Sequence, residues 1–218
     1  MKLVLASSSP RRAELLRAAG YEFDVVPVDV NESVEPGEVP ARYVRRLAAA
    51  KSAAALKVVS DLSRTSEGPP KGGRHVPVVI GDDVPVVLGA DTVVVVDGII
   101  LGKPTDDADA ARMLRLLSAK HHQVLTGISL RQGAHELGRV ETTTVQFAQL
   151  TNDEIAWYVA RGEGRDKAGA YAIQGLASRF IPRIDGSYSN VVGLPVACVR
   201  ELLIEISGTR PDRSSPSR

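Results

Sequence analysis

The sequence predicts an α/β fold. Two kinds of segment alternate along the chain. In one kind apolar residues recur every second position, as in strands, and in the other they recur every three to four positions, as in helices. A run of β-branched residues covers positions 86–96, and helical segments rich in Ala and Leu stand before and after it. With 218 residues and no internal repeat, the chain is long enough to form one sizeable core.

The first third of the chain predicts one strand and two helices. We expect a short buried strand at residues 2–6 and a helix over residues 10–19, which Gly20 ends because glycine adopts the left-handed conformation easily. A second helix is expected over residues 40–60. Residues 61–77 carry Ser, Gly, Pro and Lys with little apolar content, which predicts a loop or a disordered insert.

The middle of the chain predicts a long strand and a hairpin. The β-branched run at 86–96 is followed by Asp97-Gly98, a strong signal for a two-residue turn, and then by a short apolar stretch at 99–101. These three features predict two antiparallel strands. A helix over residues 105–118 should follow.

The last part of the chain predicts a second hairpin and two helices. The strands of the hairpin are expected at 122–131 and 137–149. A capping box beginning at Thr151 opens a helix that reaches about residue 161. Pro195 opens a last helix that ends near residue 208, and the polar tail that follows is expected to be disordered.

Composition and charge exclude several classes of function. The chain has 27 basic and 26 acidic residues, so it lacks the basic surplus typical of proteins that bind nucleic acid polymers. Its apolar runs are too short to span a bilayer, and its first residues do not form a secretory signal, so we expect no membrane association. The single cysteine, Cys198, lies in an apolar segment and should belong to the core; a chain without disulfides fits the cytoplasm.

A candidate anion site lies between residues 5 and 12. A strand ends there, three serines follow, and Ser9 is placed to be the N-cap of the next helix. Arg11 and Arg12 lie in the first helical turn, where the helix dipole disfavours cations. A phosphate bound by free backbone N–H groups, a serine hydroxyl and a guanidinium would explain this arrangement. The alternative is an ordinary capped helix with two solvated arginines.

A second candidate site is Asp91, which interrupts the apolar run at 86–96. A buried carboxylate needs a cation, a metal ion or several hydrogen-bond donors. Gly89 leaves room for a ligand or for another backbone segment to approach. The alternative is that Asp91 only accepts hydrogen bonds from nearby backbone N–H groups.

The predicted hairpin brings Lys103 into the same region. A two-residue turn places Lys103 opposite Thr92 and diagonal to Asp91. Strict alternation would put Asp91 on the other face of the sheet, but Gly102 and Pro104 flank the lysine and favour a bulge or a strand end. We therefore predict proximity of Lys103 to Asp91 and not a direct bond.

Two other features are less specific. Residues 166–175 combine small residues with Tyr171 and Gln174, which could form the wall of a base pocket, although a structural loop is the more common meaning of such a stretch. His121-His122 follows a predicted helix end and lacks the spacing of a metal-binding pair, so we expect a solvated turn there.

Taken together, these stretches resemble the Maf family from residue 1 to about 206. The resemblance is carried by these segments: Leu5 through Arg12, Tyr43 through Ala48 with Lys51, Gly89 through Val94, Gly102-Lys103-Pro104, Asp166 through Gly175 and Gly193-Leu194-Pro195.

The resemblance implies a fold like that of the inosine triphosphate pyrophosphatases, with an elongated mixed sheet flanked by helices in two lobes and a cleft between them. It implies one domain over residues 1–207 and a tail at 208–218. The longer segment near 61–86 and the tail depart from the family pattern.

The resemblance also implies hydrolysis of a nucleoside triphosphate, by attack of water on the α phosphorus, to the monophosphate and pyrophosphate. Asp91 would be the catalytic base. Glu32 would help to hold a divalent cation, Mg²⁺ or Mn²⁺, and its spacing to Gly20 favours it over Glu35. The residues that would bind the phosphates are Ser7, Arg12, Lys51 and Lys103.

Substrate preference is implied by three positions, which here hold Arg11, Thr92 and Gln174. The family branch with these residues prefers dTTP and UTP, whereas a second branch, with Trp and Glu in place of this Arg and this Gln, prefers 7-methylguanosine triphosphate. Such an enzyme could also remove non-standard nucleotides. The alternative function is that of a nucleotide-sensing regulator of septum formation in cell division, and the chain could act as a monomer or as a homodimer.

Overall fold

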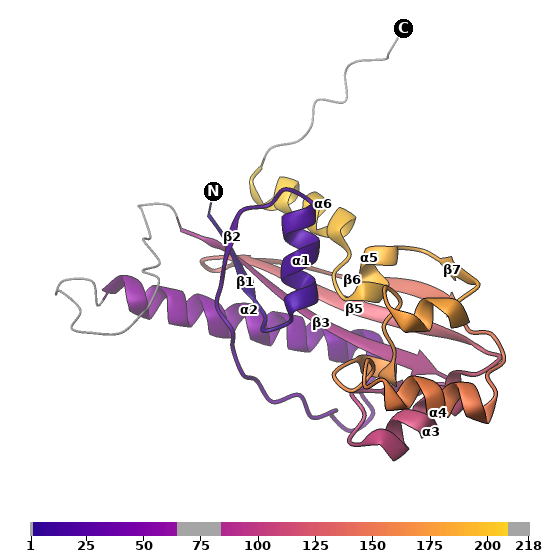
Figure 1. The fold of residues 1–218 in the computed structure, drawn as a ribbon. Helices are drawn as coiled ribbons and strands as arrows, with labels where there is room; N and C mark the ends of the chain where they lie inside the picture. Colours follow the sequence, from indigo (N-terminus) through magenta and orange to yellow (C-terminus); the bar gives the residue numbers. More distant parts are fainter. Residues whose placement is uncertain (1, 65–83, 209–218) are drawn as a thin grey trace, which may run out of the picture.

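The computed structural model describes residues 2–64 and 84–208 and confirms the α/β prediction (Figure 1). Within these residues, the strands form one mixed sheet of seven in the order β2-β1-β3-β5-β6-β7, with β4 also paired to β3. The strands are β1 (Leu3–Ala6), β2 (Phe23–Val25), β3 (Val86–Val96), β4 (Ile99–Leu101), β5 (His121–Gln132), β6 (His135–Gln146) and β7 (Arg183–Asp185).

The long helix α2 covers one face of the sheet, and α1, α5 and α6 lie on the other face (Figure 1). Helices α3 and α4 pack together at the end of the sheet where β3 meets β4. The helices are α1 (Pro10–Ala18), α2 (Pro40–Arg64), α3 (Asp107–Leu117), α4 (Asn152–Ala160), α5 (Tyr188–Val192) and α6 (Val196–Ile206), and two 3₁₀ helices, η1 (Ala168–Ala170) and η2 (Leu176–Phe180), follow α4. No helix of the described part of the chain has an apolar stretch long enough to cross a membrane.

One edge of β3 has a gap in its pairing. Strand β1 runs parallel to β3 as far as the pair Ala6 and Gly89, and β4 pairs antiparallel to the same edge from Val94 onward. Residues 90–93 therefore have a ladder partner on β5 only. Because the carboxyl end of β1 and the end of β4 both meet this gap, the segments that follow them are brought to Asp91 and Thr92.

Helix α2 lies directly on the sheet because two strand residues have no side chain. A Cβ added to Gly89 would lie 2.2 Å from the carbonyl oxygen of Ala48, and one added to Gly127 would lie 2.2 Å from that of Val44. The room that Gly89 leaves is thus taken by a backbone segment and not by a ligand. Since Gly127 is the β5 partner of Asp91, this contact holds the helix close to that carboxylate.

Most of the long elements agree with the sequence predictions. The turn at Asp97-Gly98 has positive φ at both residues, 50° and 76°, as a two-residue hairpin of this type requires. The capping box of Thr151 and Glu154 is formed in both directions. Cys198 is buried in the core, as expected.

The secondary structure differs from the prediction in two respects. The helix expected over 40–60 continues to Arg64, so the insert does not begin at 61. The rest of the predicted insert, up to residue 77, and the tail from residue 209 lie outside the described residues. The short elements β2, β7 and α5 were missed.

The interpretation of His121-His122 as a solvated turn is wrong, because both residues belong to β5 and only His121 is exposed. His122 has only 2% of its surface exposed, and its Nε2 is 2.8 Å from the hydroxyl oxygen of Tyr171. Burial lowers the pKa of His122 to about 4, because charging the ring would require water that the core excludes.

This lowered pKa predicts acid sensitivity. In the unfolded chain the ring binds a proton below its ordinary pKa of about 6.5, whereas in the folded protein it stays neutral down to about 4. The stabilisation is therefore fully present above pH ~6.5 and is lost as the pH falls toward ~4. Urea unfolding of the wild type should lose about 2 kcal/mol more between pH ~7 and pH ~5 than that of His122→Gln. Equal losses in the two proteins would contradict this account.

Candidate active site

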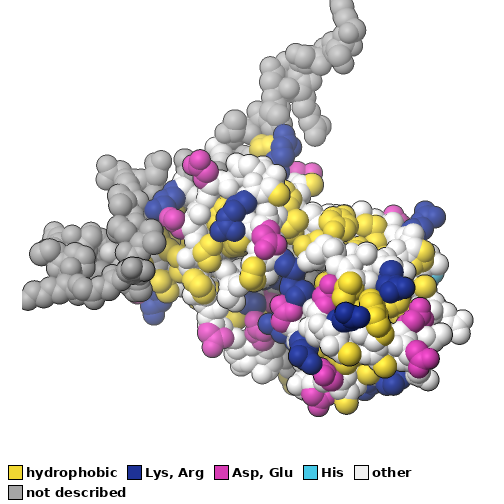
Figure 2. Space-filling model, viewed as in Figure 1, with side chains coloured by type: hydrophobic (Ala, Val, Ile, Leu, Met, Phe, Trp, Pro, Cys, Tyr) yellow, Lys and Arg dark blue, Asp and Glu magenta, His cyan; other side chains and the backbone are white. Residues whose placement is uncertain are grey.

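A cleft of ≈ 470 Å³ lies over the gap in the sheet. Figure 2 shows it as a hollow in which basic and acidic side chains gather. The structure brings every candidate site residue to this cleft: Ser7, Arg11, Arg12, Glu32, Lys51, Asp91, Thr92, Lys103 and Gln174.

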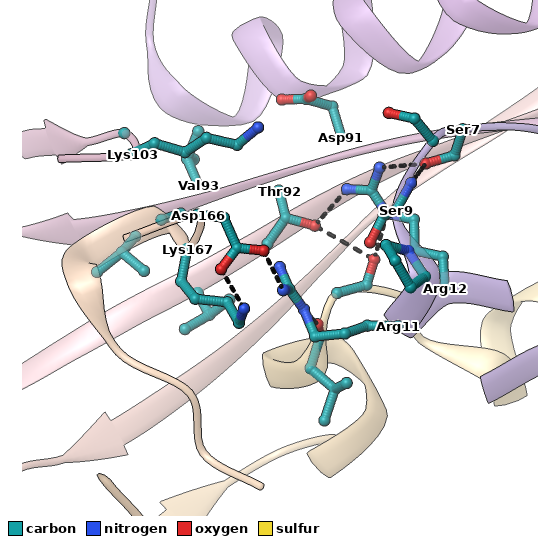
Figure 3. A pocket seen from close by; sticks show the side chains of 18 of the residues that line it. Ser7, Ser9, Arg11, Arg12, Asp91, Thr92, Val93, Lys103, Asp166 and Lys167 are labelled. Carbon is teal, nitrogen blue, oxygen red and sulfur yellow. Dashed lines mark hydrogen bonds and ion pairs between the residues drawn. The ribbon is translucent and has the colours of Figure 1, made fainter. Parts of the chain in front are cut away.

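Successive residues of β3 serve two sides of the cleft. Asp91 points toward α2, and Thr92 points to the opposite face, toward α1 (Figure 3). Both reach one cavity because no strand occupies the edge of β3 between β1 and β4. Asp91 and Thr92 thus lie on opposite faces of the sheet, as alternation predicted, and the open edge lets both contribute to one site. Lys103 lies beyond the end of β4, so alternation does not place it on either face.

On the α2 side, one lysine joins two carboxylates. The Nζ of Lys51 lies 2.7 Å from Oδ1 of Asp91 and 2.7 Å from Oε1 of Glu32. Lys51 and Asp91 are buried, whereas Glu32 is exposed on the segment between β2 and α2. The hydroxyl of Tyr43 donates a 2.8 Å hydrogen bond to the carbonyl oxygen of Glu32 and so fixes this segment to α2.

The two carboxylates differ in proton affinity. Burial raises the pKa of Asp91 above its ordinary value, although the charge and hydrogen bond of Lys51 act against this. Burial also acts to raise the pKa of Glu32, but the hydrogen bond and charge of Lys51, with the charges of Lys103 and Arg12, outweigh it and hold the pKa low. Asp91 is therefore the better proton acceptor of the pair, and Glu32 stays ionised.

The donor set at this point suits a hard divalent cation. Oxygens of Glu32 and Asp91 converge on one position, which the ammonium of Lys51 fills here. Across residues 2–64 and 84–208, no three His, Cys, Asp or Glu side chains form a metal cluster. Mg²⁺ commonly uses one or two carboxylates and completes its shell with water and substrate phosphates. Glu35 is not part of this set, because its carboxylate lies 3.4 Å from Nε of Arg46, away from the cleft.

Arg12 is held in a fixed orientation by three acceptors. Its Nε donates to the carbonyl oxygen of Gly193 at 2.8 Å, its Nη1 to the hydroxyl of Ser7 at 3.1 Å and its Nη2 to that of Thr92 at 3.0 Å. Burial lowers the pKa of Arg12, and the charge of Asp91 works against this shift. Ser9 takes the N-cap position as expected, but its side chain does not cap the helix, and its N–H donates to Ser7 instead.

The specificity candidates also line the cleft. Arg11 donates from Nε to the carbonyl oxygen of Val192 at 3.4 Å and from Nη1 to Asp166 at 3.3 Å. Gln174 is exposed, and its amide makes no hydrogen bond to any described residue. Thr92 contacts Arg12 and also shares a 2.9 Å hydrogen bond with Thr126, so it can act on a ligand both directly and through Arg12.

Lys103 lies just past the end of β4, as the flanking glycine and proline suggested. It is exposed and lines the same cleft as Asp91, and none of the described residues bonds to its ammonium. Its charge is close enough to contribute to the low pKa of Glu32. Lys103 and Asp91 thus line one cleft without a direct bond, and the ammonium is free to meet an anion.

Sequence reasoning assigned no role to Asp166, Lys167 or Tyr43. All three line the cleft, and Asp166 forms ion pairs with Arg11 and Lys167 (Figure 3). The sequence pointed to these residues only weakly. Residues 166–175 were predicted only as a possible wall of a base pocket, and Tyr43 was named only in the family resemblance.

Comparisons with known proteins show the family of the chain. The model of the family described as Maf-like protein matches residues 2–206. A dTTP/UTP pyrophosphatase of Shewanella oneidensis is 46% identical over 210 residues, which cover 94% of this chain and 98% of that protein. A protein of the same name from Anaeromyxobacter dehalogenans is 48% identical over 208 residues, covering 93% and 92% of the two chains. Among solved structures, the Ham1 protein of Staphylococcus aureus aligns with a TM-score of 0.48 at 16% identity, covering 94% of this chain and 100% of that one.

Proposed function

Because the chain belongs to the Maf family, we propose that it is a nucleoside triphosphate pyrophosphatase that converts dTTP and UTP to their monophosphates and pyrophosphate. The observation that carries this proposal is the position of Asp91. A buried carboxylate with a raised pKa lies in a cleft with three cationic side chains that an anionic substrate can reach, namely Arg12, Lys51 and Lys103. This is the arrangement that phosphoryl chemistry needs, because catalysis there depends on position and charge.

In the proposed reaction, Asp91 takes a proton from the water that attacks the α phosphorus. Lys51 and Lys103 bind phosphate oxygens and stabilise the charge that develops on them, and Ser7 donates a hydrogen bond. The leaving group is pyrophosphate. Arg12 supports the phosphates from a guanidinium that the protein has already oriented, so little entropy is lost when the substrate binds.

A divalent cation, Mg²⁺ or Mn²⁺, fits beside Glu32 and Asp91 and would supply positive charge to the phosphate oxygens. Lys51 now occupies the point between these carboxylates. Its long, flexible stem allows its ammonium to move from the carboxylates to a phosphate when a nucleotide enters. We expect the reaction to take place in the cytoplasm, where the nucleotide pool lies.

A role as a nucleotide-sensing regulator of septum formation is not favoured. The curated relatives are named as enzymes, and a purely regulatory site would need no buried base beside its phosphate ligands.

The proposal is tested by measuring pyrophosphate release from a panel of canonical and modified triphosphates, with Mg²⁺, with Mn²⁺ and with chelator. We expect the fastest release from dTTP and UTP and almost none with chelator. If nucleotide binds but pyrophosphate is released in none of these conditions, the enzymatic function is contradicted and the regulatory alternative is favoured.

The base preference has its own test. Thymine and uracil are neutral and present alternating C=O and N–H groups, which the free amide of Gln174 can meet with one donor and one acceptor. A methylated guanine is cationic and suits a stacked Trp and a carboxylate. The double variant Arg11→Trp with Gln174→Glu should therefore shift the ratio of kcat/KM toward 7-methylguanosine triphosphate.

The surface variant Arg200→Trp, on α6, is the matched control and should keep the pyrimidine preference. If the double variant stays fully active on dTTP and UTP with an unchanged ratio, Arg11 and Gln174 do not set the specificity.

A further inference from the structure

We propose that Asp166 is a positioning residue that reserves Arg11 for the base of the nucleotide and keeps phosphate groups away from it. This inference rests on the proposed function and extends it to a residue with no assigned role. The observation behind it is an acidic side chain that stands between two cations in a cleft built to receive an anion (Figure 3).

Each oxygen of the Asp166 carboxylate is taken by a different cation. Oδ2 lies 3.3 Å from Nη1 of Arg11, and Oδ1 accepts from Nζ of Lys167. Arg11 comes from α1 and Asp166 from the loop before η1, so the pair joins opposite walls of the cleft. The carboxylate itself is largely exposed, with 64% of its side chain accessible, and is therefore not needed to complete a core.

The backbone that carries Asp166 is tightly fixed. The N–H of Gly169 donates to the carbonyl oxygen of Gly102 at 3.0 Å, next to Lys103. A Cβ on Gly164 would lie 2.0 Å from the carbonyl oxygen of Ala170, so the loop folds closely on itself. A carboxylate on so constrained a segment can hold the guanidinium of Arg11 in one orientation.

Charge explains why such a carboxylate would be kept. Without it, Arg11 and Lys167 would form a second pair of cations in the same cleft, on the side away from Asp91. Guanidinium groups bind phosphate well through paired N–H donors. A triphosphate could then bind in the reverse direction, with its phosphates on Arg11. Asp166 offsets this charge and makes the reverse orientation unfavourable.

The same contact leaves Arg11 able to meet a neutral base. Its Nε is directed to the carbonyl oxygen of Val192 and its Nη1 to Asp166, and none of the described residues accepts from Nη2. A carbonyl oxygen of a pyrimidine is a suitable acceptor for this remaining group. Asp166 thus acts on the base through Arg11, while it also offsets the charge of Lys167.

The test uses Asp166→Asn, which keeps the size of the side chain and removes its charge. Two quantities are measured on the full chain: the ratio of kcat/KM for UTP over GTP, and the inhibition constant of inorganic pyrophosphate. We expect the ratio to fall by about fivefold and pyrophosphate to inhibit about fivefold more strongly, the upper range for one exposed ion pair. In the Arg11→Ala background, the same substitution should leave the ratio unchanged and should strengthen pyrophosphate inhibition less than in the wild type, because only Lys167 is then released from Asp166.

Asp107→Asn is the matched control. Asp107 makes two 2.9 Å contacts with Arg165, the neighbour of Asp166, but does not line the cleft. This variant should resemble the wild type in both quantities.

The outcomes separate the two proposals. If Asp166→Asn equals the wild type in both quantities, or if its effects are equally large without Arg11, the inference is overturned. If the wild type hydrolyses no nucleotide, the proposed function fails. Calorimetric binding of pyrophosphate to the wild type, Asp166→Asn, Arg11→Ala and the double variant then still decides whether Asp166 screens Arg11.

Discussion

Replacing Asp91 by asparagine is expected to lower kcat by at least about a hundredfold, the low end for loss of a general base. The amide keeps the shape of the side chain but cannot take a proton from water. Nucleotide binding should change far less, because Arg12, Lys51 and Lys103 remain, and Lys51 keeps its 2.7 Å contact with Glu32. Single-turnover assays together with equilibrium binding of a non-hydrolysable dTTP analogue separate these effects.

The pH profile gives a second measure of the same role. Because burial raises the pKa of Asp91, activity of the wild type should fall with acid at a higher pH than an ordinary aspartate would give, and this limb should be absent from the residual activity of the variant. Asp97→Asn makes the same chemical change at the turn after β3 and should keep normal kinetics. A kcat near normal in Asp91→Asn would remove Asp91 from the catalytic step.

Arg12→Ala should have the second largest effect. We expect kcat to fall and KM to rise, so that kcat/KM is lower by about a hundredfold or more. Arg12 meets charge that the substrate carries before and during the reaction. Removing it also leaves Ser7, Thr92 and the carbonyl of Gly193 without a shared donor, which should destabilise the fold by about 1–3 kcal/mol. Arg12→Lys should not restore activity, because one ammonium cannot replace a planar fork with three fixed contacts.

Two variants separate catalysis from stability. Lys103→Ala should lower kcat/KM without changing the urea midpoint, since this exposed ammonium has no partner among the described residues. Arg17→Ala, on the same helix as Arg12 but stacked on Phe23, should leave the kinetics normal. If Arg12→Ala and the wild type have equal kinetics, the phosphate-binding assignment is wrong.

The sequence predicted the long elements well because their signals are local. The eleven residues of β3 are mostly β-branched, which predicts a strand, and Asp97-Gly98 predicts the turn that follows it. β2 and β7 have three residues each and exist because neighbouring strands supply their hydrogen bonds, which no local pattern reveals. His122 was misjudged because two adjacent histidines look polar, whereas the alternation at the start of β5 exposes His121 and buries His122.

The site was predicted as a set of residues but not as a geometry. Arg11 and Asp166 are 155 positions apart, and their pairing depends on how α1 and the loop before η1 meet over the sheet. That Asp91 and Thr92 share one cleft could not be predicted either. It depends on where β1 and β4 stop pairing with β3, and the sequence does not give the register of these strands.

The gap in the edge of β3 also bears on self-association. Unpaired strand edges can recruit a strand from another molecule and so begin aggregation. Here the open stretch covers only residues 90–93, and β1 and β4 occupy the same edge on either side. An incoming strand would collide with both before it could form a ladder. This gap can thus present unpaired backbone to a small molecule without itself offering other copies of the chain a template for polymerisation.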